Sequence, residues 1–157
     1  MKPHVFIICA VWLLGCNVLP TESVSTTVDG FTETDNLGSV IRNDPDDWRT
    51  QERYRNEVFV SPAFPNPTIN GNITVPVRYS LASPLPRVDV IGINTVGNPV
   101  FLWSAPPPQI GIEFYRLNLL SLSPTNNFND LRGRLFRIRF IDPAGNTISY
   151  GDVKFRE

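Results

Sequence analysis

"LFRIRF", residues 135 to 140, decides the fold class because apolar and basic side chains alternate along it. Successive side chains of a β-strand face opposite ways, so its phenylalanines and isoleucine point to one side and Arg137 and Arg139 to the other. This alternation is typical of a strand that packs one face on a core and turns the other toward solvent. We therefore predict a strand over residues 132–141.

The same pattern recurs in "ITVPVRYSL", residues 73 to 81, where every second side chain is apolar. Pro76 lies within this run and has no N–H for a sheet, so we expect this strand to be at an edge or to be bulged there. Short runs rich in β-branched and aromatic residues, separated by Pro, Gly and Asn, extend the pattern through the second half of the chain. Seven short strands with turn signals between them predict an all-β fold, a seven-stranded antiparallel sandwich. Their expected ranges are 58–64, 73–81, 87–94, 99–104, 110–120, 132–141 and 147–155.

Four motifs occur in order along this half of the chain. They are Pro65-Asn66-Pro67, Arg78-Tyr79-Ser80-Leu81, Asn94 to Val100 with Gly97, and Gly133 to Phe140 followed by a hairpin at Gly145. With these motifs, residues 58 to 155 resemble the carboxy-terminal immunoglobulin-like domain that serves as a type A sorting signal in type IX secretion. They are similar, too, to the related domain of flagellar hook-capping proteins. The resemblance implies an immunoglobulin-like sandwich over residues 58–157.

The start of the chain has the pattern of a secretory signal, with Lys2, then ten apolar residues, then Gly15. Ten residues are too few to cross a bilayer, which takes about 20 in a helix. "LLGC", residues 13 to 16, directly follows this apolar core and resembles the lipobox of bacterial lipoproteins. In that family the signal is removed before the cysteine and acyl chains are attached to it. We expect residues 1–15 to be a signal peptide and Cys16 to be lipidated.

Attachment by more than one acyl chain makes membrane association stable, because each buried methylene contributes about 0.8 kcal/mol. Asn17 follows the cysteine, where an aspartate would resemble an inner-membrane retention signal. The expected location is therefore the cell envelope, with the outer membrane favoured. Residues 16–47 are rich in Ser, Thr, Asp and Asn without periodicity, which predicts a flexible tether. Residues 48–57 are expected to form a short collar, helical if Asp46 or Asp47 caps it.

Composition excludes several kinds of chemistry. His4 and Cys9 would leave with the signal peptide, and Cys16 would carry lipid, so no imidazole or thiol remains for nucleophilic catalysis or for most zinc sites. The formal net charge of −1 gives no reason to expect nucleic-acid binding. The loop at residues 125–131 offers oxygen ligands but only one carboxylate, far from a calcium-loop signature. We predict no enzyme activity, no catalytic residues, no cofactor and no metal.

A basic strip near the C-terminal end is the candidate partner surface. It is interpreted either as a site for lipid phosphate, lipopolysaccharide or an acidic partner, or as edge-strand arginines that discourage sheet pairing. A proline-rich segment, residues 104–110, adjoins Trp103 and is interpreted either as a docking site for a partner or as a rigid crossover between the two sheets. The residues of this surface are Arg132, Arg134, Arg137, Arg139 and Trp103.

The leading hypothesis is a lipid-anchored bacterial envelope lipoprotein whose sandwich binds or scaffolds a protein partner without catalysis. The alternative is a sorting-signal domain of type IX secretion, or an accessory protein of that system. A lipobox at the other end of the chain favours the anchored module.

Overall fold

The computed structural model describes residues 28, 30–80 and 85–157. The described chain forms antiparallel sheets and only three-residue 3₁₀ turns, so the all-β prediction is confirmed. Nine strands are described rather than seven, because two short strands precede the predicted set. The strands are β1 Glu33–Thr34, β2 Val40–Arg42, β3 Val58–Val60, β4 Asn72–Tyr79, β5 Val88–Ile93, β6 Pro99–Ala105, β7 Gly111–Asn118, β8 Leu135–Ile141 and β9 Thr147–Lys154. The 3₁₀ turns are η1 Glu52–Tyr54, η2 Leu120–Leu122 and η3 Phe128–Asp130.

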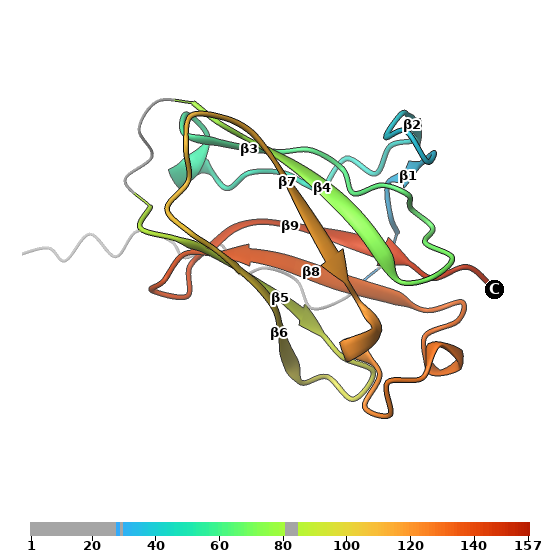
Figure 1. Cartoon of the computed structure of the whole chain (residues 1–157). Coiled ribbons are helices and arrows are strands. Elements are labelled where there is room, and N and C mark those ends of the chain that lie inside the picture. The colour runs from blue at the N-terminus through green and yellow to red at the C-terminus, as the bar shows by residue number, and fades with distance from the viewer. Residues whose placement is uncertain (1–27, 29, 81–84) are drawn as a thin grey trace, which may run out of the picture.

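Two sheets pack face to face in a sandwich-like arrangement (Figure 1). One has the strand order β3-β4-β7 and the other β6-β5-β8-β9, and all pairs within them are antiparallel. The ribbon of β1 and β2 lies at the same end of the molecule as the C-terminus. Each strand from β3 to β9 corresponds to one of the seven predicted ranges.

The alternating runs form the core between the sheets. Every apolar side chain of β4 predicted to face inward is at most 2% exposed, and Ile138 and Phe140 of β8 are fully buried. Tyr115 of β7 meets the ring of Phe140 edge-on across the sandwich, with ring centroids 5.6 Å apart. Burying a side chain of this size stabilises a fold by about 1.5–3 kcal/mol.

Pro76 lies in the middle strand of its sheet, so the expectation of an edge position is wrong. Its carbonyl accepts from the backbone N–H of Ser61 at 2.9 Å, and its nitrogen therefore faces β3 as well. β3 ends at Val60 opposite Val77, and pairing resumes only where Phe64 bridges Thr74. Residues 61–63 thus lie opposite residues 75 and 76 of β4, which is a bulge. Because regular pairing is interrupted there, the sheet does not require an N–H from Pro76. The predicted bulge is present, carried by the partner strand.

The segment predicted as a flexible tether makes specific contacts with the sandwich within residues 30–47. The backbone N–H of Thr34 donates to the carbonyl of Asn66 at 2.8 Å, and its hydroxyl donates to the carbonyl of Ala63 at 2.7 Å. Thr32 and Thr34 are buried. The tether prediction over residues 16–47 is therefore wrong for residues 30–47, which are held by polar contacts with the sandwich rather than by an apolar face. Residues 16–27 and 29, with the lipidation residue Cys16, lie outside the described residues.

The outer edge of β9 is covered by the segment that precedes β3. The backbone N–H groups of Trp48 and Gln51 donate to the carbonyls of Tyr150 and Ile148 at 2.6 and 2.8 Å. The expected collar at residues 48–57 contains one 3₁₀ turn, η1, rather than an α-helix. Free strand edges invite pairing with other chains, and this cover removes one such edge.

Asn66 ties the same edge together from its buried position in the Pro-Asn-Pro motif. Its side-chain amide donates to the carbonyls of Thr32 and Asp152 at 2.8 and 2.9 Å, and its oxygen accepts from the N–H of Lys154 at 2.9 Å. One side chain therefore joins the N-terminal segment to β9.

Candidate functional site

Three of the four predicted arginines line one pocket. Arg134, Arg137 and Arg139 face a cavity of about 550 Å³ on the outer side of the four-stranded sheet. Arg132 lies elsewhere, with its guanidinium 5.6 Å from the centre of the Phe128 ring. Trp103 is 48% exposed on β6 and does not line the pocket. The structure thus brings together Arg134, Arg137 and Arg139, and it separates Arg132 and Trp103 from them.

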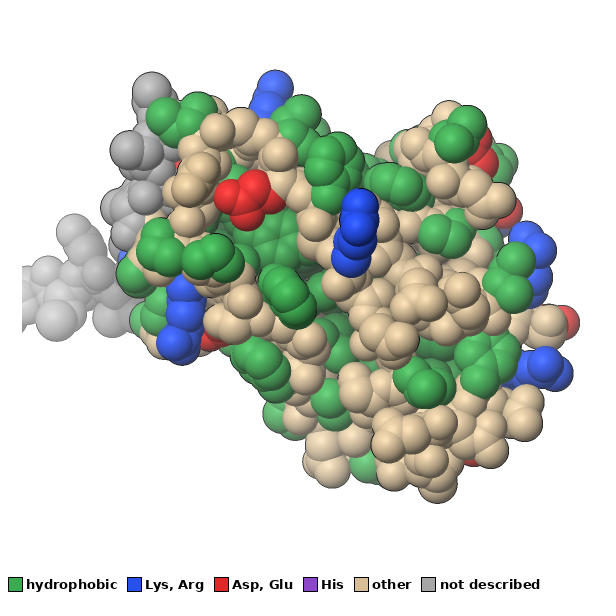
Figure 2. Space-filling model, viewed as in Figure 1, with side chains coloured by type: hydrophobic (Ala, Val, Ile, Leu, Met, Phe, Trp, Pro, Cys, Tyr) green, Lys and Arg blue, Asp and Glu red, His purple; other side chains and the backbone are tan. Residues whose placement is uncertain are grey.

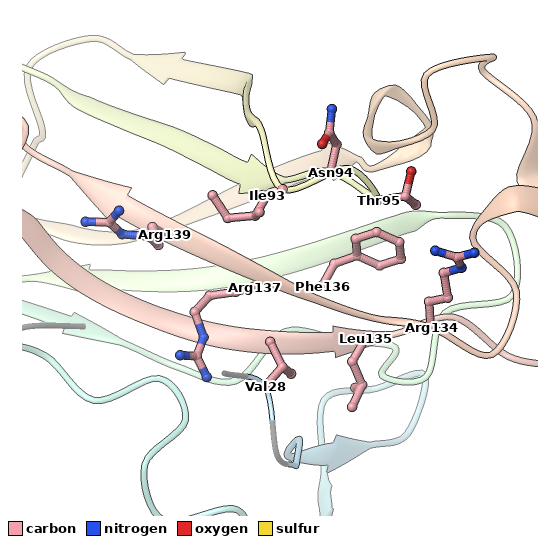
Figure 3. Close-up of a pocket in the computed structure, with 10 residues that line it drawn as sticks. Val28, Ile93, Asn94, Thr95, Arg134, Leu135, Phe136, Arg137 and Arg139 are labelled. Atoms are coloured by element: carbon pink, nitrogen blue, oxygen red, sulfur yellow. The ribbon is translucent and has the colours of Figure 1, made fainter. Parts of the chain in front are cut away.

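The pocket wall combines three segments (Figure 3). The turn between β5 and β6 supplies one side, held by the side chain of Asn94, which accepts from the N–H groups of Val96 and Asn98. β8 supplies the floor, and Val28 approaches from the N-terminal segment. Among the described residues, the lining consists of Val28, Ile93, Asn94, Thr95, Gly97, Arg134, Leu135, Phe136, Arg137 and Arg139. The strand-turn-strand at Asn94 to Val100 was predicted, but its place beside the arginines was not.

Arg137 is neutralised within the protein. Its Nε and Nη2 donate to the two carboxylate oxygens of Asp152 at 2.8 and 2.6 Å, and both residues are buried. The hydrogen bonds to Asp152 raise the pKa of Arg137, so the guanidinium stays charged. Its carbon Cζ also lies 4.6 Å from the centre of the Tyr150 ring. The charge of Arg137 is therefore balanced within the protein and serves to hold β8 to β9.

Asp47 adds a second buried carboxylate beside this pair. It accepts from the backbone N–H of Thr32 at 2.7 Å and from that of Asp152 at 2.9 Å. Burial raises the pKa of Asp47 to about 7, and the nearby Asp152 adds to the increase. Sequence reasoning assigned Asp47 to a helix cap, whereas it fastens the N-terminal segment to β9.

Replacing Asp47 with asparagine is expected to flatten the dependence of stability on pH. The folded protein binds a proton at Asp47 more tightly than the unfolded chain, whose ordinary pKa is 3.8. The stability that follows from this difference is fully present below pH 3.8 and is lost as the pH rises through about 7. Urea unfolding of both proteins across this range measures the difference. Parallel curves for Asp47→Asn and the wild type would contradict the assignment, whatever their offset.

Arg139 has no such partner. One of its terminal nitrogens, Nη2, donates to the hydroxyl of Thr147, but its Nε is buried without a hydrogen-bond acceptor in the described part of the chain. No ion pair to Arg139 is present among those residues. Burial, together with the neighbouring Arg137, lowers the pKa of Arg139. A half-buried cation that lacks a counter-charge is costly, and an anion in the pocket would offset that cost.

Other parts of the surface present less chemistry. At the loop of residues 125–131, Oδ2 of Asp130 accepts from the hydroxyls of Ser123 and Thr125, so this oxygen is already bonded within the protein. Within residues 28, 30–80 and 85–157, no cluster of three or more His, Cys, Asp or Glu is arranged to hold a metal.

The outer face of the three-stranded sheet is partly apolar. Phe59, Ile112 and Phe114 are 54–60% exposed there, and the guanidinium of Arg78 lies 5.3 Å from the centre of the Phe59 ring. Figure 2 shows hydrophobic side chains interspersed with polar surface. Among the described residues, this face has no counterpart of the half-buried Arg139 without an ion pair that distinguishes the pocket on the other sheet.

Comparisons of the chain with protein-family models, curated proteins and solved structures find no match. None of the helical segments in the described chain is long and apolar enough to cross a membrane.

Proposed function

We propose that the protein is a lipid-anchored lipoprotein of the bacterial envelope whose immunoglobulin-like sandwich is a non-catalytic binding module. The observation that carries the binding role is the pocket of about 550 Å³ with Arg139 beside it, since ligand sites are typically concave spaces of 300–1,000 Å³. Its described lining offers guanidinium, amide and hydroxyl groups together with apolar walls, which suit binding and orientation.

The anchor is supported by the sequence and agrees with the position of the pocket. Val28 lines the pocket and follows Cys16 by twelve residues. At about 3.3–3.6 Å per residue, a chain of that length reaches at most about 40 Å. A lipid on Cys16 would therefore keep the pocket near the membrane surface and set its ligands among the molecules found there.

Replacing Cys16 with serine is expected to remove the acyl chains. Intact mass spectrometry of the wild-type protein from the membrane fraction should give a chain that begins at residue 16 with the added mass of acyl groups. Cys16→Ser should lack that mass and lose partition into detergent. Cys9→Ser is the matched control and should keep both properties, because Cys9 lies before the cleavage site. A wild-type chain without acyl mass would reject the anchor.

A further inference from the structure

Two guanidinium groups in the pocket are free of ion pairs within the described chain. Arg137 forms an ion pair with Asp152, whereas neither Arg139 nor the exposed Arg134 has a described carboxylate within salt-bridge distance. In Figure 3, Arg134 and Arg139 extend toward opposite ends of the site. An anion with several oxygens satisfies unpaired guanidinium groups by charge-assisted hydrogen bonds to their accessible N–H donors.

The rest of the pocket selects against a free, fully hydrated ion. Ile93, Leu135 and Val28 bring apolar surface to the same space as the two arginines. Apolar surface gains free energy when it is covered by an apolar group, at about 25 cal/mol per Å². The ligand that meets both demands has an anionic head attached to an apolar chain.

We propose that the arginine pocket binds the headgroup phosphate of an anionic lipid, with the first part of its acyl chain against Ile93 and Leu135. The choice of a lipid rests on the proposed anchor, which holds the pocket near a bilayer. Binding of this lipid turns the outer face of the sheet β6-β5-β8-β9 toward the membrane. The module is then oriented on the surface as well as tethered to it.

The test uses the full lipidated protein in lipid nanodiscs made either of neutral phosphatidylcholine or of that lipid mixed with anionic phosphatidylglycerol. The readout is the NMR cross-peak of each arginine Nε–H, assigned through Arg139→Gln, Arg134→Gln and Arg116→Gln. Arg116 is exposed on β7 of the other sheet and reports any general effect of surface charge. The Arg139 cross-peak is expected to shift in anionic discs only, while that of Arg116 stays in place.

Removing the Arg139 guanidinium is expected to raise the amount of anionic lipid needed to shift the backbone amide cross-peak of Ile93, beside the proposed acyl chain, roughly tenfold, because hydrogen bonds to charged groups are lost. The Arg116→Gln protein should behave as the wild type. Because Arg139 is half-buried and unpaired, Arg139→Gln should unfold no more easily than the wild type in neutral discs.

Three results would overturn the proposal. An unchanged Arg139 cross-peak in anionic discs rejects lipid binding, and equal shifts of Arg116 and Arg139 reduce it to general surface charge. A shift produced by inorganic phosphate in neutral discs assigns the site to a free anion. A protein without acyl chains would fail to enter the discs, which rejects the anchor alone. Short-chain phosphatidylglycerol in solution, against phosphatidylcholine of the same chain length, then tests lipid binding by the pocket through the same cross-peaks.

Discussion

Replacing Asp152 with alanine is expected to lower the free energy of unfolding by about 3–5 kcal/mol, because it removes the carboxylate that neutralises the buried guanidinium of Arg137. The pair is bidentate, and Asp152 and Arg137 are 2% and 5% exposed. The guanidinium keeps its charge and loses both of these hydrogen bonds. Urea unfolding of the wild type and of Asp152→Ala, both at neutral pH, measures the loss.

Two further variants show that the effect comes from the unpaired charge. Replacing both partners, Arg137→Met with Asp152→Leu, should recover most of the stability, since no charge is then stranded. Glu52→Ala breaks the exposed pair with Arg55 and should cost less than about 1 kcal/mol. If Asp152→Ala cost no more than Glu52→Ala, the pair would be of no consequence for the fold.

Replacing Trp48 with alanine is expected to cost about 3–5 kcal/mol, the range for large aromatic side chains in cores. Trp48 is 4% exposed, and a Cβ on Gly151 would lie 2.1 Å from its ring atom Cε2. The indole therefore fits against β9 only because residue 151 has no side chain. Thermal and urea unfolding measure the cost.

The matched control is Trp103→Ala, at a tryptophan that is 48% exposed, and it should cost well under half as much. Gly151→Ala attacks the same contact from the strand and should destabilise by about 1–3 kcal/mol through overpacking. Equal effects of Trp48→Ala and Trp103→Ala would show that the segment before β3 contributes little to stability.

The sequence predicted the strands because their signal is local. Alternation along β4 and β8 places the apolar side chains in the core without reference to any other part of the chain. The placement of Arg137 and Arg139 on one face follows from the same period of two. The sequence therefore predicted the basic face of β8 that lines the pocket, but not the other segments that line it.

The rest depends on contacts between residues far apart in sequence. That Asp152 neutralises Arg137 while Arg139 stays unpaired follows from the register of β8 with β9, which alternation alone does not fix. The same register shifts between Phe140 and Ile141, where β9 carries one extra residue between Thr147 and Ser149, and Gly151 pairs regularly with Ile138. The ring of Tyr150 lies on the outer face next to Arg137.

The tether was mispredicted because polar segments were judged by their apolar content. Within residues 30–47, the backbone of Thr32 and Thr34 bonds to Asn66, and the N–H of Thr32 also donates to Asp47. Such contacts leave no periodic pattern in a sequence. Compositional arguments for disorder count only the apolar surface that a segment can bury. Here the N-terminal segment supplies missing partners to the edge of a sheet instead.

The cover on β9 also fixes when the protein can finish folding. Asp47 bonds to a residue 105 positions later, and Asn66 and Tyr54 each reach 88 positions along the chain. Contacts of such separation are slow to form, because a long loop must close before they are made. A nascent chain that still lacks residues 146–157 has no β9, and therefore lacks the groups of that strand to which Asp47, Trp48 and Gln51 bond. Folding is therefore completed only after β9 has been synthesised, because the segment before β3 reaches its final contacts only with that strand.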